Sequence, residues 1–407
     1  MRAIVIVPVV VWIAGLAVLT AYIFTDAASA VTHGFVAYYG AARLLVSGEL
    51  GVSAYNDDWF RAYVQSITGT GVLEIFTPNP PMMALMAAPL AWLDHATARP
   101  LWLVASLCAL AAASLALLRY RERAGAPLTA AIVAIVLLNP STFANLRTGQ
   151  GYLFVFALLT GAALSVVTGH DRRAGIFLGL AFGLKSTGLP LLLLLVVARR
   201  WRAIQAFVVV VAATVGVTAL LVDPDMWWRY PSTVSEFVNR PSGSVTAYQT
   251  TLGLFRRLCI ADPVWNPHPA ADCASMAFTV PSILLAAAML VTVVLARRSP
   301  THLWAAAGVC LCELSMPAAA EPHFILFAVP LALLVLSPAM LAVFAVLYLV
   351  PLARTAQVFT DGWSVLAAYP RLYAVWLLWG LAVAAMLRYS PVADARATRS
   401  AGTVDAA

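Results

Sequence analysis

One lysine stands out among the residues that could carry out chemistry. Lys185 is the only lysine in the chain, because the other 24 of its 25 basic residues are arginine, and it lies within the apolar run AGIFLGLAFGLKSTGLPLLLLLVV. A cation at the centre of a bilayer costs about 3 kcal/mol or more, so it normally faces a cavity or a partner. Gly183, Gly188 and Pro190 predict a break in the helix here. Lys185 is therefore a candidate anion ligand, and snorkelling of its ammonium to the membrane interface is the alternative.

Basic residues at both ends of this run predict how it folds. Arg172–Arg173 precede it and Arg199–Arg200 follow it, and such clusters favour the cytoplasmic side of a membrane. The roughly 26 residues between them are too many for one relaxed span and too few for two. We therefore predict a hairpin, bent within Lys185–Pro190, that holds Lys185 toward the outer half of the membrane. Glu313 is a candidate ion-pair partner for Lys185, since buried charges are usually paired.

Other polar residues predicted on the outer side are candidates for the same site. Cationic side chains bind phosphate through charge-assisted hydrogen bonds, and a carboxylate or a histidine can remove a proton from an attacking hydroxyl. The candidate phosphate ligands are Lys185, Arg147 and His323; the candidate bases are His33, Asp57 and Asp58; the candidate substrate contacts are Tyr38, Asn79, Gln150 and Glu321. An aspartate at the start of a short helix is alternatively its N-cap. Because no HxxxH or CxxC spacing and no P-loop or Rossmann glycine pattern occurs, we expect no metal and no cofactor.

The composition defines the class of protein. The chain is 62% hydrophobic and only 11% charged, whereas a soluble domain is about 25% charged. We predict an all-α polytopic membrane protein with about 12 transmembrane helices plus re-entrant or interfacial helices, since a span needs about 20 apolar residues. Residues 1–389 would form a single membrane domain without a cleaved signal peptide, and 390–407 a disordered cytoplasmic tail. Clusters of arginine between the apolar runs explain the net charge of +7 without nucleic acid as a partner.

Three segments are predicted to lie outside the membrane, at 25–79, 223–277 and 353–370, with both termini in the cytoplasm. In the first segment, Phe35, Tyr38 and Tyr39 recur at helical spacing, which predicts an interfacial helix with its aromatic rings among lipid headgroups. Residues 80–93 are too short for a comfortable span and predict a half-helix or a re-entrant piece. Residues 139–151 predict an external turn. Cys259 and Cys273 share the second segment, and both a disulfide and two free thiols remain open.

Several motifs, in their order along the chain, resemble glycosyltransferase family 87. They are FVAYYGAARLLVSGELGVSAYNDDWF, TPNPPMMALMAAPLAWL, NLRTGQGYLFVFALL, AGIFLGLAFGLKSTGLPLLLLLVVARRWRA and EPHFILFAVPLALL. The resemblance implies a membrane glycosyltransferase of GT-C architecture in the bacterial cytoplasmic membrane, with its active site on the external side. It further implies a mannose-like hexose or a pentose on a polyprenyl-phosphate donor, and a hydroxyl of a lipid-linked glycan or glycolipid as acceptor. Neither a nucleotide nor a metal is implied.

One position departs from the family pattern. The family has an aspartate, the expected catalytic base, immediately before the aromatic residue of the first motif, and this chain has Gly34, preceded by His33. The base is then His33, Asp58 or Asp57, and a histidine is suitable because its pKa lies near neutrality. Two alternatives to an active transferase remain. One is a transporter or flippase of a lipid-linked sugar or organic anion, and the other is a non-catalytic protein that kept the fold.

Overall fold

The computed structural model describes residues 2–22, 27–28, 31–123, 129–350 and 352–389, so the predicted tail at 390–407 lies outside the described residues. Within the described ranges every regular element is a helix, which confirms the all-α class. Four described helices are long and apolar enough to cross a membrane. They are α5 (His95–Arg123), α11 (Trp201–Ala219), α14 (Met276–Ala296) and α19 (Pro370–Arg388).

Most of the other apolar helices are shorter than the roughly 20 residues that a straight span requires, and the structure does not confirm a total of twelve spans. The shorter ones include α8 (Tyr152–Val167), α15 (Thr301–Leu314), α16 (Ala328–Leu333) and α17 (Pro338–Leu349), whereas α1 (Arg2–Tyr22) has 21 residues. The external turn predicted at 139–151 is largely a helix, α7 (Pro140–Thr148), which follows α6 (Thr129–Leu137). The break falls at Pro140, which cannot donate a helical hydrogen bond.

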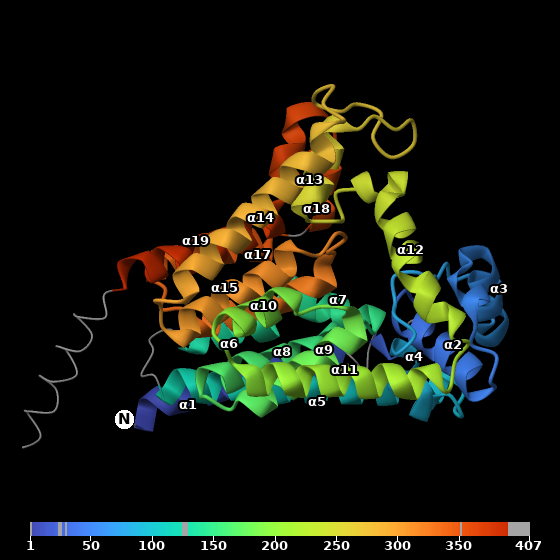
Figure 1. Ribbon diagram of the computed structural model, residues 1–407, viewed down its shortest axis with the longest axis horizontal. Coiled ribbons are helices and arrows are strands. Elements are labelled where there is room, and N and C mark those ends of the chain that lie inside the picture. The colour runs from blue at the N-terminus through green and yellow to red at the C-terminus, as the bar shows by residue number, and fades with distance from the viewer. Residues whose placement is uncertain (1, 23–26, 29–30, 124–128, 351, 390–407) are drawn as a thin grey trace, which may run out of the picture.

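The helices form two inclined layers with a cluster of short helices at one end (Figure 1). Helices α1, α5, α8 and α11 lie in the lower layer, while α14 and α19 slope away above them. Helices α2 (Phe35–Val46), α3 (Asp57–Thr68) and α12 (Asp225–Asn239) lie at the right of the view, and α1 begins and α19 ends at the left. The start of α1 and the end of α19 therefore lie at the opposite end of the molecule from α2, α3 and α12.

Helix α2 forms where the aromatic spacing predicts it, but its environment differs from the prediction. Phe35, Tyr38 and Tyr39 are each at most 1% exposed, so α2 is a buried helix and not an interfacial one. The predicted half-helix consists of α4 (Met83–Ala87) followed by η3 (Ala88–Leu90), and both pack against α2. An apolar face can pack against lipid or against protein, and its spacing does not distinguish the two.

The predicted hairpin around Lys185 is present. Helix α9 (Asp171–Lys185) ends at the lysine, and α10 (Leu189–Val197) begins after three intervening residues. Ser186 and Gly188 between them have φ angles of 48° and 99°, which turn the chain back. At the open end, Asp171 and Arg200 form an ion pair with an N–O distance of 3.1 Å. This pair closes the base of the hairpin, so Lys185 lies at its tip.

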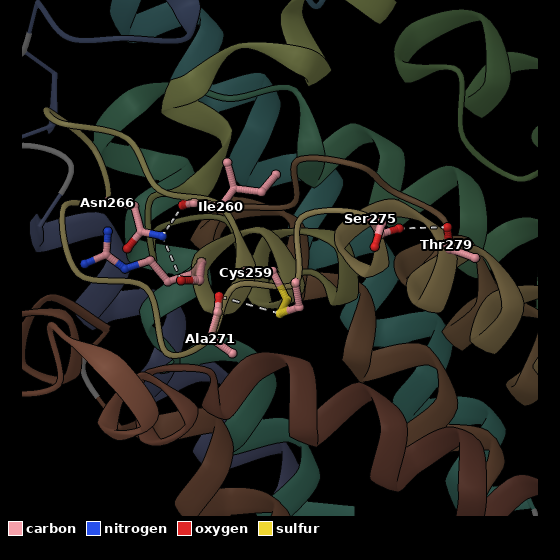
Figure 2. The surroundings of a disulfide bond; sticks show 8 residues. Cys259, Ile260, Asn266, Ala271, Ser275 and Thr279 are labelled. Atoms are coloured by element: carbon pink, nitrogen blue, oxygen red, sulfur yellow. Dashed lines mark hydrogen bonds between the residues drawn. A yellow bond between two sulfur atoms is a disulfide. The ribbon is translucent and has the colours of Figure 1, made fainter.

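The second predicted external segment is cross-linked by a disulfide between Cys259 and Cys273, which resolves the alternatives left open by the sequence. Figure 2 shows it at the end of α13 (Thr251–Cys259). The loop that it closes is held further by Asn266, whose amide donates to the carbonyls of Arg257 and Ile260. Disulfides persist in oxidising compartments, so this bond supports an external location for the loop.

We expect Cys259→Ser together with Cys273→Ser to lower the free energy of unfolding by about 3 kcal/mol, as for other cross-linked loops of this size. In intact cells that produce the chain with Cys108, Cys310 and Cys312 replaced by alanine, a membrane-impermeant maleimide should label these two thiols only after an impermeant reductant. Labelling that requires cell lysis would place the loop inside and contradict the topology.

Candidate active site

A cavity of about 940 Å³ lies where the tip of the hairpin meets the predicted external helices. Its lining comes from α2, the loop at 73–79, the start of α8, the hairpin tip, α12 and the segment at 312–323. The structure brings six of the predicted site residues to it. They are His33, Tyr38, Asn79, Gln150, Lys185 and His323.

The ammonium of Lys185 is held by neutral partners. It donates to the hydroxyl of Tyr38 and to Oδ1 of Asn79, both at 2.8 Å. Tyr38 in turn donates to Gln150, and Asn79 is fixed because its backbone carbonyl accepts from Tyr55. A lysine ammonium has three donors, so one N–H is left for a ligand in the cavity.

Glu313 does not pair with Lys185, contrary to the prediction. No ion pair among the described residues includes Lys185, and both carboxylate oxygens of Glu313 are buried without a hydrogen-bond partner. Glu313 lies on α15 outside the cavity lining, whereas Lys185 turns toward α2. The ammonium is therefore a positive charge without a bound carboxylate, beside a cavity large enough for a ligand.

Two further groups beside Lys185 suit an anion. Thr187 is only 5% exposed, lines the cavity, and its Oγ1 has no hydrogen-bond partner. Helix α10 begins at Leu189 beside it, and a helix N-terminus carries a partial positive charge. On the other side, the Tyr152 ring lies 5.3 Å from Nζ of Lys185 and stacks on His323 with ring centroids 3.8 Å apart. The hairpin tip is thus lined by a cation, a free hydroxyl and aromatic rings.

Another part of the lining is apolar. It contains Leu189 and Leu193 of α10, Val234 and Phe237 of α12, and Met289 of α14. Leu189 and Leu193 are 51% and 41% exposed, so this side of the cavity presents accessible apolar surface. Helix α12 is joined to the hairpin by Tyr230 and Ser186, whose hydroxyls are 3.0 Å apart. One cavity therefore combines a cationic end with an apolar side, as an amphipathic lipid would require.

Four of the predicted site residues do not line the cavity, and three of these lie on α3 and α7. Asp58 is exposed and pairs with Arg61, and Asp57 is held by Thr77 and by Arg240. Neither is the N-cap of α3, because Asn56 accepts from the backbone N–H groups of Asp58 and Trp59. The side chain of Arg147 is exposed on α7, and its backbone carbonyl accepts from Thr32 and Arg99.

Glu321 also lies outside the cavity lining. Its carboxylate forms two hydrogen bonds of 3.1 Å with Arg371 and accepts from Ser141 at 2.8 Å. Arg371 is fully buried and also donates to the carbonyls of Leu347 and Val350 near the end of α17. This ion pair joins α7, α17 and α19, which is a structural role for Glu321.

Glu74 is a cavity residue that the sequence motifs did not predict. This residue is only 6% exposed and lines the cavity. It accepts hydrogen bonds from the backbone N–H groups of Gly34 and Ile75. Oε1 of Glu74 lies 3.9 Å from Nδ1 of His33, and the interaction with this carboxylate raises the pKa of His33 above its ordinary value. Glu74 follows a polar loop with no motif around it, and nothing in the sequence links it to position 34.

Gly34 has a conformation that other residues cannot easily adopt. Its φ is +114°, and a Cβ atom there would lie 2.6 Å from the carbonyl oxygen of Thr148 and 3.0 Å from Nε2 of Gln150. The backbone at this position therefore approaches the turn before α8 closely, and this approach orders the start of α2. The local backbone conformation therefore favours glycine at position 34, the position that departs from the family pattern.

We expect Gly34→Ala to destabilise the protein by about 1 to 3 kcal/mol, because the residue is in a strained backbone region and the added methyl group clashes with backbone. Gly48→Ala is the matched control. Gly48 also has positive φ, +73°, but a Cβ there meets nothing within 4 Å, so only the conformational cost remains. Thermal unfolding in detergent compares the two, and an equal effect of both would contradict the role of close packing at Gly34.

The comparison with known families agrees with the site. The model of glycosyltransferase family 87 matches residues 76–317, which is more than half of the chain and includes the Lys185 hairpin. The match begins after His33, Gly34 and Glu74. No curated protein matches the chain. The family match confirms the resemblance of the sequence motifs, and the chain belongs to glycosyltransferase family 87, a family of membrane glycosyltransferases.

Proposed function

We propose that this protein transfers a mannose-like hexose or a pentose from a polyprenyl-phosphate donor to a hydroxyl of a lipid-linked glycan or glycolipid. The reaction would take place at the outer face of a bacterial cytoplasmic membrane, in a single GT-C domain formed by residues 1–389. The observation that carries the proposal is the position of Lys185. Its ammonium lies at the tip of a hairpin, without a carboxylate partner, and lines a cavity that also has an apolar side.

The cationic end suits the phosphate of the donor. One N–H of Lys185 is free, and Oγ1 of Thr187 has no partner. Charge-assisted hydrogen bonds from such groups stabilise the negative charge that develops on a leaving phosphate. His323 lies behind the Tyr152 ring in the same wall. Arg147 would contribute only if its exposed side chain turned toward the substrate.

The apolar side suits the polyprenyl chain, and the remaining polar lining suits the sugar. Leu189, Leu193 and Met289 offer an apolar path beside the phosphate. Asn79 and Gln150 are near Lys185, within reach of hydroxyl groups on a sugar bound there. Of the three bases that the sequence predicted, only His33 lines the cavity, so the acceptor hydroxyl is expected to approach from that end.

The proposal is tested with the purified full-length protein in lipid nanodiscs. Radiolabelled polyprenyl-phosphate hexoses and pentoses serve as donors, and glycolipids extracted from a strain that lacks this protein serve as acceptors. We expect labelled product together with free polyprenyl phosphate for one donor class. Movement of intact labelled donor across the bilayer without its cleavage would favour the flippase alternative, and the absence of both would favour the non-catalytic alternative.

A further inference from the structure

The carboxylate of Glu74 lies in the part of the cavity where the proposed reaction needs a proton acceptor. Among the described residues that line the cavity, Glu74 is the only one with a carboxylate. Its oxygens accept from the backbone N–H groups of Gly34 and Ile75. An ionised carboxylate has about four acceptor positions, so these two bonds orient the group and leave capacity for a substrate hydroxyl.

The carboxylate of Glu74 lies next to the backbone of Gly34, the position that has no side chain in this protein. The resemblance of the first motif to the family implies an aspartate at position 34, where this chain has glycine. The backbone N–H of Gly34 is the donor to Oε2 of Glu74, so a carboxylate from the loop at 73–79 lies directly against position 34. The close approach of Thr148 to Gly34 leaves no room for a side chain there in this backbone conformation. The absence of a side chain at Gly34 and the position of the Glu74 carboxylate therefore depend on the same local backbone conformation.

Three of the titratable groups that line the cavity with Glu74 come from different parts of its wall. They are His33 before α2, Tyr38 within α2, and Lys185 at the end of α9. Lys185 marks the expected position of the leaving phosphate, and Glu74 and His33 lie together at another part of the lining. A sugar carbon between these two parts would have a proton acceptor and a leaving-group site available to it.

We propose that Glu74 is the general base of the sugar transfer, an assignment that rests on the proposed function. The acceptor hydroxyl oxygen forms a bond to the anomeric carbon while the bond from that carbon to the phosphate oxygen breaks. The electron pair of the broken bond leaves with the polyprenyl phosphate, held by Lys185, and the hydroxyl proton moves to the Glu74 carboxylate. His33, whose side chain is 65% exposed, is a positioning residue and passes the proton on to water.

The experiment compares Glu74→Gln with the wild-type enzyme and with Glu49→Gln, a matched control on an exposed residue outside the cavity lining. We expect Glu74→Gln to lower kcat by about 100-fold or more, as expected for loss of a general base. Its affinity for polyprenyl phosphate alone should be unchanged, because the Lys185 end is intact. Formate should restore transfer by Glu74→Ala in a concentration-dependent way, since a small carboxylate can enter the space left by the side chain.

The results separate two kinds of failure. A wild-type enzyme that transfers no sugar from any donor overturns the proposed function, and the assignment of Glu74 with it. With an active wild-type enzyme, the assignment requires a slow Glu74→Gln variant that still binds polyprenyl phosphate, a wild-type rate for Glu49→Gln, and rescue of Glu74→Ala by formate. Any other combination overturns it and leaves Glu74 as a residue that only holds the start of α2.

Discussion

Replacing Lys185 with alanine should reduce sugar transfer by about 100-fold or more, the usual effect of removing one group that stabilises charge in a transition state. The variant should nevertheless remain folded. Lys185 is partly buried without an ion-pair partner, so its removal also removes an unfavourable desolvation of charge. We therefore expect a thermal midpoint equal to or above that of the wild-type protein. This combination, lost activity with retained or increased stability, is typical of a residue kept for function.

The measurement is transfer from labelled polyprenyl-phosphate sugar together with thermal unfolding of the same preparation. Arg298→Ala is a suitable control, because Arg298 is an exposed cation outside the cavity lining. Undiminished transfer by Lys185→Ala would remove the main support for a phosphate site at the hairpin tip. Loss of transfer together with unfolding would instead assign Lys185 a structural role, through its bonds to Tyr38 and Asn79.

Replacing Arg371 with alanine should cause the largest loss of stability. The change leaves the carboxylate of Glu321 with Ser141 as its donor but without its cation. It also removes the Arg371 donor from the carbonyls of Leu347 and Val350. Breaking a buried ion pair by removing one partner typically costs about 3 to 5 kcal/mol. Replacing Arg371 and Glu321 together by leucine should cost less than Arg371→Ala, because no unpaired charge then remains.

The control is the exposed ion pair between Arg229 and Glu236, whose side chains are 51% and 58% exposed. Glu236→Ala should change stability by less than about 1 kcal/mol, as is usual for surface pairs. Unfolding in a denaturing detergent, followed by tryptophan fluorescence, compares the variants. If Arg371→Ala and Glu236→Ala have similar effects, the buried pair is not the link between α7, α17 and α19 that its hydrogen bonds suggest.

The sequence predicted the main features around Lys185 because strong local signals define them. A lone cation in an apolar run, with glycine and proline beside it and arginines at both ends, predicts a bent hairpin, and the structure has one. The helix α2 was likewise predicted from local spacing, whereas the disulfide was one of two alternatives that the sequence left open. Tyr38, Asn79 and Gln150 reach Lys185 because the motifs that contain them fold onto the hairpin.

The remaining site residues could not be predicted, because they depend on which segments pack together. Glu321 has the residue type of a substrate contact, but Arg371, fifty positions later, takes up its charge. Asp58 remains in solvent at the first turn of α3. Glu74 has no motif around it, and only the fold brings it to Gly34. The buried environment of α2 was missed for the same reason, since its apolar face would have looked identical against lipid.

The apolar side of the cavity has a consequence for how the protein is handled. Leu189 and Leu193 line the cavity, and both are exposed. Such an exposed apolar surface binds hydrocarbon chains of different kinds. An acyl tail or a detergent molecule would therefore occupy the same place as an isoprenoid. The amphiphile chosen for purification is then a competitor of the substrate and not an inert solvent.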